Sequence, residues 1–289
     1  MSHKTIIKAI FMLSWAAGCV EGVPPSDRGQ DARDTKAAVA PVDAVLERLN
    51  KTASELKSYE AEIEYKFSQP LLQSETLNKG VLYYARSGGT SALRVNFNVR
   101  KQDDEKEQKY LEQYIVVDGA KLPHPSRKFK GVWLVHLDYQ IKEVTYYQLA
   151  EPNDPNTSQD LFDLASRNLP VLGFARTEDL KKEFEVELVE AEKGKPTDFA
   201  QVHLKVKPNS VYKDDYVSMD FWIDEKLGLP AKVVAVKTEP EPPFGDVQEV
   251  KFLKPKVNKG VDQTLFELKI PKGFGEPEIT PLQKKSTQQ

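Results

Sequence analysis

The chain has 289 residues, of which 39% are hydrophobic and 29% are charged. The apolar fraction suffices for one large core, and the charged fraction is too high for a body embedded in a membrane. With a formal net charge of −3, nothing in the composition steers the chain toward nucleic acid. No apolar run reaches the roughly 18 to 20 residues that a spanning helix needs. Composition therefore favours one large, water-exposed domain.

The first residues have the pattern of an export signal. Lys4 and Lys8 give a positive start, residues 9–17 are a short apolar stretch, and Gly18 precedes Cys19. Because this stretch is too short to anchor a protein, the pattern predicts a cleaved signal peptide over residues 1–18. The alternative is an amphipathic helix.

Cys19 is the sole cysteine, so no disulfide can form within the chain. Residues 16–19, Ala-Ala-Gly-Cys, resemble a bacterial lipobox, which implies that Cys19 becomes an acylated first residue. Ala stands at position 16, where that pattern usually has Leu. Ala16 and Gly18 also satisfy ordinary small-residue cleavage at the same bond, so a soluble periplasmic or secreted form is the alternative. Val20 after an acylated Cys19 would favour the outer membrane.

Two segments lack any periodic apolar pattern. Residues 19–40 are rich in Pro, Gly, Ser and charged residues, and we expect a flexible tether there. The polar tail over 276–289 contains Pro, and we expect disorder. One domain over 41–275 lies between them.

The domain begins with a helical pattern over Pro41–Lys57. Its apolar residues fall on one helical face, and they are Val42, Val45, Leu46, Leu49, Ala53 and Leu56. Pro41 suits a first helical turn, and Lys57 suits a last one.

From Tyr59 the apolar period changes to two, which is typical of strands with one buried face. Further strand patterns follow at short intervals, and we expect the polar residues Arg94 and Arg100 to be solvated. Asp118-Gly119 predicts a hairpin turn. The predicted strands are 59–67, 80–86, 93–99, 109–117, 131–137, 141–149, 184–190, 200–206, 217–224, 232–238 and 248–252.

Two further helical patterns interrupt this series, over residues 154–170 and 178–184. A string of about ten or eleven consecutive strands with short links indicates an antiparallel meander. A sheet this long must twist and curl, and its concave apolar face then needs a cover. We therefore predict a mainly β fold, an incomplete antiparallel β-barrel with a helical lid over an apolar cavity.

Several segments resemble the outer-membrane lipoprotein carrier (LolA) superfamily in order and spacing. They are Tyr59–Tyr65, Gly80–Arg86, Val116–Gly119, Phe221–Pro230 and the closing Phe266–Phe274. The resemblance covers roughly residues 42–275. It implies a half-barrel that carries or senses lipoprotein acyl chains in the periplasm, and related members act as receptors or envelope-stress sensors.

The resemblance also implies a role for Arg86. In the family, an arginine at the end of the second strand stands in an Arg-Pro pair and helps to hold the lid closed. Here Ser87 replaces that Pro. We expect Arg86 to bond to lid carbonyls or to ligand, and the alternative is a surface arginine at a strand end.

Other residues are candidates for lining an acyl pocket or forming its lid. The aromatic ones are Tyr65, Tyr83, Phe97 and Trp133, and the lid ones are Leu161, Phe162 and Leu164. The alternative for each aromatic is ordinary barrel core, and for the lid a packed surface helix.

No cofactor, metal site or catalysis is predicted. The histidines lack the spacing of paired metal ligands, and no nucleophile elbow or phosphate-cradling loop occurs in the sequence. We expect a monomeric lipid- or lipoprotein-binding protein of the cell envelope, active in lipoprotein sorting or localisation and tethered to the outer membrane through Cys19. The alternatives are a tethered envelope-stress sensor and a structural lipoprotein with the same fold.

Overall fold

We describe the protein from a computed structural model. It describes residues 41–87, 90–123, 128–151, 177–190, 198–240 and 245–281. The predicted signal peptide, Cys19, the tether and the helix predicted over 154–170 lie outside these residues. The lid candidates Leu161, Phe162 and Leu164 lie outside them as well.

The described strands form one twelve-stranded sheet in the order β12-β6-β5-β4-β3-β2-β1-β11-β10-β9-β8-β7. All neighbours pair antiparallel except β12 and β6, which run parallel. Two meanders, β1 to β6 and β7 to β11, are therefore joined through the β1–β11 pair. Because β12 and β7 are the two edges, the described sheet is not closed, which confirms the predicted incomplete barrel.

The strands agree with the predicted segments, and most are longer at one or both ends. The first meander consists of β1 Ser58–Gln69, β2 Ser74–Ser87, β3 Thr90–Gln102, β4 Gln108–Asp118, β5 Val132–Asp138 and β6 Glu143–Ala150. The second consists of β7 Phe184–Val189, β8 Phe199–Val206, β9 Tyr216–Asp224, β10 Pro230–Lys237 and β11 Val247–Val257. Short 3-10 turns occur at η1 Pro70–Leu72, η2 Gly119–Lys121 and η4 Gln263–Phe266.

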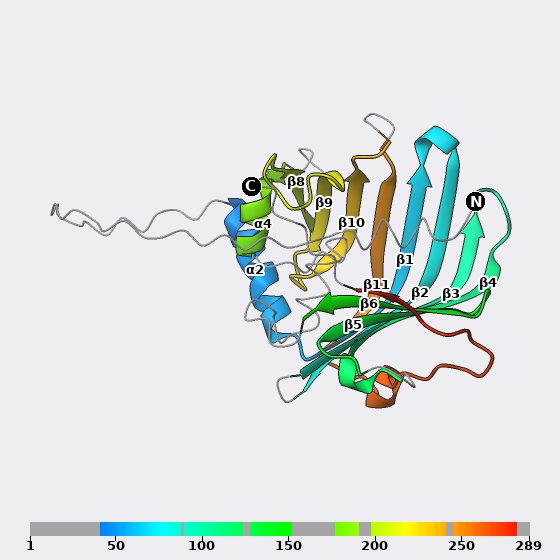
Figure 1. Cartoon of the computed structure of the whole chain (residues 1–289). Helices are drawn as coiled ribbons and strands as arrows, with labels where there is room; N and C mark the ends of the chain where they lie inside the picture. The colour runs from blue at the N-terminus through cyan, green and yellow to red at the C-terminus, as the bar shows by residue number, and fades with distance from the viewer. Residues whose placement is uncertain are drawn as a thin grey trace, which may run out of the picture.

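The two described α-helices lie against one face of the sheet. Helix α2 spans Pro41–Glu55 and α4 spans Thr177–Glu183. The predicted apolar stripe is the buried face of α2, since Leu46 and Leu49 are buried and Val42, Val45 and Ala53 pack against the same core. We call the sheet face that contacts α2 the inner face. Figure 1 shows α2 and α4 beside β8 at the open side of the curled sheet.

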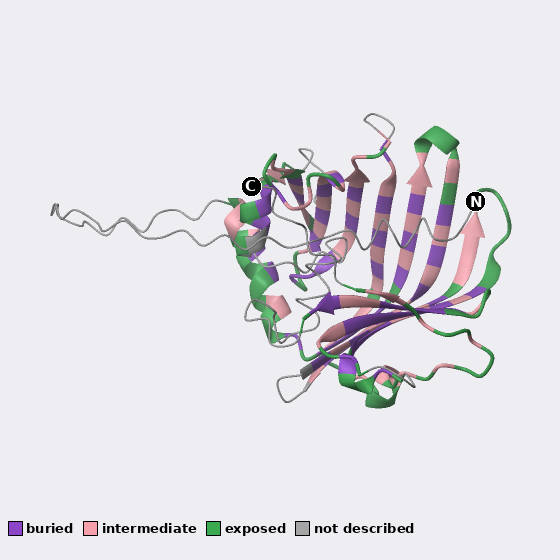
Figure 2. Cartoon of the chain, viewed as in Figure 1, coloured by how far each residue is buried: buried purple, intermediate pink, exposed green. Residues whose placement is uncertain are grey.

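The opposite, outer face carries a second core over β4 to β6. Buried Ile115, Val117, Trp133 and Tyr146 belong to it, and the chain from 268 to 279 packs against it. Figure 2 shows the resulting burial of β5 and β6, in contrast to the alternating stripes of β1 and β2. This segment ends in β12, Glu278–Thr280, so the tail predicted from Glu276 begins with a strand.

The turn predicted at Asp118-Gly119 is also corrected. β4 and β5 do pair antiparallel, but the connection between them runs from Gly119 to Gly131. The Asp118 carboxylate accepts from the Ala120 N–H and caps the short helix η2. A side-chain cap therefore replaces the two-residue hairpin.

A β-bulge in β3 changes which face its last residues occupy. The register shifts between Phe97 and Val99, leaving Asn98 as the extra residue. A Cβ on Gly80 of the neighbouring strand would lie 2.0 Å from the Asn96 carbonyl oxygen, so the approach requires glycine. Beyond the bulge, Arg100 lies on the inner face opposite Asn78. The expectation of a solvated Arg100 is therefore wrong.

Candidate functional site

The inner face has an apolar half and a polar half. The apolar half lies at the strand ends near the C-terminus of α2, and its side chains are buried in one core. Its members include Tyr59, Leu82, Leu93, Val116, Leu134, Val202, Phe221, Val233 and Phe252. The three buried leucines of α2 and its C-terminal flank, Leu46, Leu49 and Leu56, complete this core.

Arg86, at the end of β2, links the sheet to α2. Its Nη1 donates to the Ser54 carbonyl oxygen at 2.6 Å, and its Nε donates to the Tyr84 hydroxyl at 2.8 Å. The guanidinium thus meets a carbonyl in the last turn of α2, where the helix dipole favours a positive charge. The Arg86 N–H also donates to the Lys57 carbonyl at 2.8 Å.

Two further polar contacts hold α2 along its length. Arg48 Nη1 donates to the Glu225 carbonyl at 2.8 Å, in the turn between β9 and β10. Asp43 in the first turn pairs with Lys181 of α4 at 2.7 Å. Both contacts are largely exposed, so each holds the helix only weakly.

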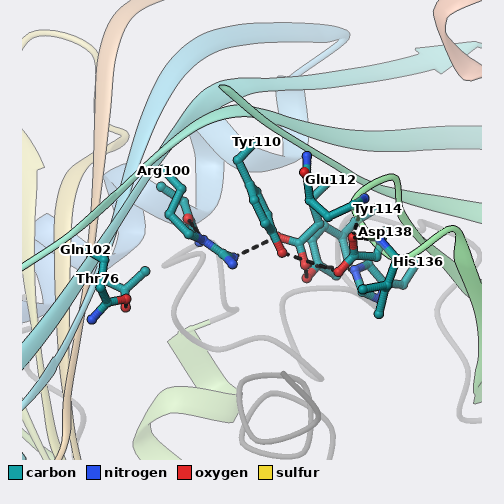
Figure 3. A network of polar contacts seen from close by, with 11 residues as sticks. Thr76, Arg100, Gln102, Tyr110, Glu112, Tyr114, His136 and Asp138 are labelled. Atoms are coloured by element: carbon teal, nitrogen blue, oxygen red, sulfur yellow. Dashed lines mark hydrogen bonds and ion pairs between the residues drawn. The ribbon is translucent and has the colours of Figure 1, made fainter. Parts of the chain in front are cut away.

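The polar half lies at the other strand ends, where β1 meets β2 and β3 meets β4. Beside Phe67 and Phe97, it carries hydrogen-bonding side chains. They are Tyr65, Thr76, Asn78, Arg100, Gln102, Tyr110, Glu112, His136, Asp138 and Gln248. Figure 3 shows the side chains of β3, β4 and β5 pointing toward one another in this region.

Glu112 is at the centre of this network and is only 5% exposed. One carboxylate oxygen accepts from His136 Nε2 and from the Tyr114 hydroxyl, both at 2.8 Å. Burial by itself raises the pKa of Glu112, but the bonds from His136 and Tyr114 and the charge of Arg100 outweigh it, so the pKa is lowered. The His136 ring stacks on Tyr114, with centroids 4.5 Å apart, which fixes its orientation.

Arg100 is the cation of the network and is fully engaged. Its Nε donates to the Asn78 side-chain oxygen at 2.8 Å, and its Nη2 lies 3.5 Å from the second Glu112 oxygen. Its guanidinium carbon sits 3.4 Å from the centroid of the Tyr110 ring. The Tyr110 hydroxyl in turn donates to Asp138 at 3.3 Å. The charges of Arg100 and Glu112 are therefore both paired within the chain.

Two buried polar groups, the Tyr65 hydroxyl and Gln248 Nε2, lie next to this network, and their residues are 7% and 1% exposed. Burial raises the pKa of Tyr65, and a side-chain hydrogen bond from Gln248 acts in the opposite direction, so the two groups are each other's neighbours. The amide oxygen of Gln248 is used, because the Tyr216 hydroxyl donates to it at 3.3 Å.

The structure divides the aromatic residues proposed from the sequence. Tyr65 and Phe97 lie on the inner face with ring centroids 6.3 Å apart. Tyr83 lies between inner-facing Leu82 and Tyr84, on the outer face, and Trp133 belongs to the outer core. The first pair therefore meets at the polar half, and Tyr83 and Trp133 do not reach it.

Arg94 needs a correction like that of Arg100, for a different reason. It is on the outer face as expected, but η4 covers it. Its guanidinium donates to the Leu265 carbonyl at 2.5 Å and to Gln113 and Asn96 at 2.8 and 2.7 Å. It fixes the C-terminal segment to the sheet instead of facing water.

Sequence reasoning missed Glu112 and His136 as members of a site. The available signal was the alternation Tyr110, Glu112, Tyr114 and Val116, which sets a carboxylate among inner-facing residues. Within the described ranges, no group of three or more His, Cys, Asp or Glu side chains is arranged to hold a metal ion. None of the helices described is both long and apolar enough to cross a membrane.

No protein-family model matches this chain, and no curated protein matches its sequence. Solved structures do resemble it. One is a DUF1329 family protein from Desulfovibrio piger, with 11% identity and a TM-score of 0.39, covering 78% of this chain and 97% of that one. Another is an outer membrane lipoprotein-sorting protein domain from Vibrio parahaemolyticus, with 11% identity, a TM-score of 0.36 and coverage of 78% and 97%.

A third similar structure is the Pseudomonas aeruginosa MucA/MucB complex. The matching chain has 13% identity and a TM-score of 0.38, and the alignment covers 80% of this chain and 62% of that one. All three TM-scores are below 0.5.

Proposed function

We propose that the protein binds lipids or lipoproteins in the cell envelope by holding acyl chains against the apolar half of its inner face. The observation that carries this proposal is an unclosed sheet whose inner face is hydrocarbon at one end and hydrogen-bonding at the other. Such a surface matches an amphipathic ligand with a tail and a polar group. Binding, and not catalysis, is the expected activity.

An acyl chain would exchange places with the buried leucines of α2. Burial of each CH₂ contributes about 0.8 kcal/mol, but displacing Leu46 and Leu49 gives up burial of the same kind. The net affinity should therefore be modest, which suits a protein that must also release its ligand. The helix contacts made by Arg86, Arg48 and Asp43 are polar and partly exposed, and they can break and re-form.

Location and partners belong to the same proposal. A signal peptide over 1–18 and acylation of Cys19 would tether the chain to the periplasmic face of the outer membrane. Lipoproteins in transit would then be its ligands. The intact mass of the protein extracted from cells tests this, because an acylated N-terminal Cys19 adds the mass of its acyl chains to the mature chain.

Lipid binding is tested with the full-length protein in two ways. Mass spectrometry of gently extracted protein should find bound lipid, and a fatty acid should displace a hydrophobic fluorescent dye. Val95→Trp adds bulk to the partly buried inner face and should weaken dye binding, while Glu64→Trp adds the same bulk outside and should not. A folded protein that carries no lipid and releases no dye would refute the proposal and favour the structural lipoprotein.

A further inference from the structure

The two edges of the sheet differ in how well they are closed to further pairing. β12 spans only three residues, and Pro277 and Pro281 stand directly before and after it. Short strands and proline are common protections of a sheet edge, because proline has no N–H to donate. β7, at the other edge, has six residues, Phe184–Val189, and contains neither proline nor glycine. Within the described residues, no strand pairs with the far side of β7, so its backbone can accept a further strand.

The side chains of β7 alternate between an apolar and an acidic face. Phe184 is buried on the inner face, and Val186 and Leu188 pack against the same core. Glu185 and Glu187 point the other way and are exposed on the outer face. Because helix α2 contacts β7, a strand added here would carry its apolar side chains toward the helix and its polar ones outward.

The charges on the outer face select the polar side chains of the added strand. Glu185 pairs with Lys205 of β8 at 3.4 Å, which leaves its other side open to a second cation. Glu187 lies opposite His203, whose Nδ1 is 3.1 Å from the Asp220 carboxylate. Glu187 forms no ion pair within the described residues. Since opposite charges on directly opposed residues stabilise a strand pair, lysine or arginine suits the positions beside these two carboxylates.

The same charges make a second copy of this chain a poor partner. If β7 strands from two copies paired, Glu185 and Glu187 of both copies would share one face, and opposed like charges destabilise a strand pair. Pairing of β7 with β12 of another copy would meet the flanking Pro277 and Pro281. The partner strand therefore comes from a different protein.

We infer that β7 is a docking edge for an extended segment of another protein, in which lysine or arginine alternates with apolar residues. The segment adds to the sheet as a further strand through backbone hydrogen bonds, which is a common way to bind a peptide. Its apolar side chains lie beside Val186 and Leu188, and its cations lie beside Glu185 and Glu187. This inference adds a protein partner and does not depend on acyl-chain binding.

The test titrates full-length protein into three fluorescently labelled hexapeptides and follows fluorescence anisotropy. Their sequences are Lys-Val-Lys-Val-Lys-Val, Glu-Val-Glu-Val-Glu-Val and Lys-Pro-Lys-Pro-Lys-Pro. A cross-strand charge pair changes affinity by about twofold to fivefold in either direction, so the lysine–valine peptide should bind about tenfold or more tightly than the glutamate peptide. The lysine–proline peptide has the same charge but cannot pair as a strand, and it should bind as weakly as the glutamate peptide.

Variants and hydrogen exchange assign the binding to β7. Glu187→Lys should weaken binding of the lysine–valine peptide by about fivefold or more and strengthen binding of the glutamate peptide. Glu62→Lys makes the same charge change on β1, in the middle of the sheet, and should leave both affinities unchanged. In the free protein, the amides of residues 184–189 that do not bond to β8 should exchange rapidly, and the lysine–valine peptide should slow them.

Three results would overturn the docking edge. Equal binding of the lysine–valine and lysine–proline peptides would mean attraction between charges without an added strand. Unchanged binding to Glu187→Lys would place the peptide elsewhere on the protein. Full protection of all β7 amides in the absence of peptide would mean that the chain covers this edge itself. None of these results bears on acyl-chain binding, which uses the inner face.

Discussion

Replacing Arg86 by Met should loosen helix α2 while leaving the sheet intact. The methionine keeps most of the aliphatic stem and removes the bonds to the Ser54 carbonyl at 2.6 Å and the Tyr84 hydroxyl at 2.8 Å. A hydrogen bond from a charged donor is worth about 1.5 to 3 kcal/mol, and partial exposure of the guanidinium favours the lower end. We therefore expect a loss of about 2 kcal/mol. In a domain of this size, that lowers the melting temperature by about 4 to 8 °C.

Hydrogen exchange shows where the loss occurs. Arg86→Met should speed exchange of the amides in 41–55, because opening of α2 becomes easier. Arg94→Met is the matched control, since Arg94 also donates to a backbone carbonyl, that of Leu265 on the outer face. It should speed exchange near 262–266 and leave α2 protected. An α2 that exchanges at the wild-type rate in Arg86→Met would refute the assignment of Arg86 as a contact that holds this helix.

Three further substitutions test the packing and the network, each by denaturant unfolding. Gly80→Ala places a Cβ 2.0 Å from the Asn96 oxygen and should cost about 3 kcal/mol, whereas Gly275→Ala meets no atom within 4 Å and should cost little. Leu49→Ala should cost about 3 kcal/mol by leaving a cavity under α2. Glu112→Gln should cost about 2 kcal/mol at pH 7. Because the folded pKa of Glu112 is lowered, this difference should shrink as the pH falls below about 4.3.

The regular elements could be predicted because their signals are local. Alternation from Tyr59 to Phe67 and the apolar stripe of α2 reflect burial of one face, which each segment displays by itself. In β5 the sequence is apolar almost without interruption from Val132 to Leu137, as expected for a strand buried on both faces. The outer face of β5 is covered by residues 268 to 279, which lie far along the chain. Nothing in the sequence of β5 itself indicates that this segment covers it.

The candidate site could not be predicted in the same way, because it depends on how neighbouring strands pair and not on the pattern of any single segment. Arg94, Asn96, Asn98 and Arg100 alternate without a break in the sequence, a pattern that by itself predicts all four on one face. The bulge at Asn98 breaks that alternation, and it forms where β2 presents Gly80. The alternating pattern also does not tell on which face of the sheet Tyr83 and Trp133 lie. That depends on how their strands pair as well as on the pattern.

The polar half is hard to explain by stability alone. Buried ion pairs such as Arg100 with Glu112 often contribute no more than well-packed hydrocarbon of the same volume. The rest of the inner face shows that the fold can fill this surface with hydrocarbon. A network in which Glu112, His136 and Arg100 pair their own charges, set beside an apolar surface, matches the polar part of an amphipathic ligand, which is the ligand class that the proposed function requires.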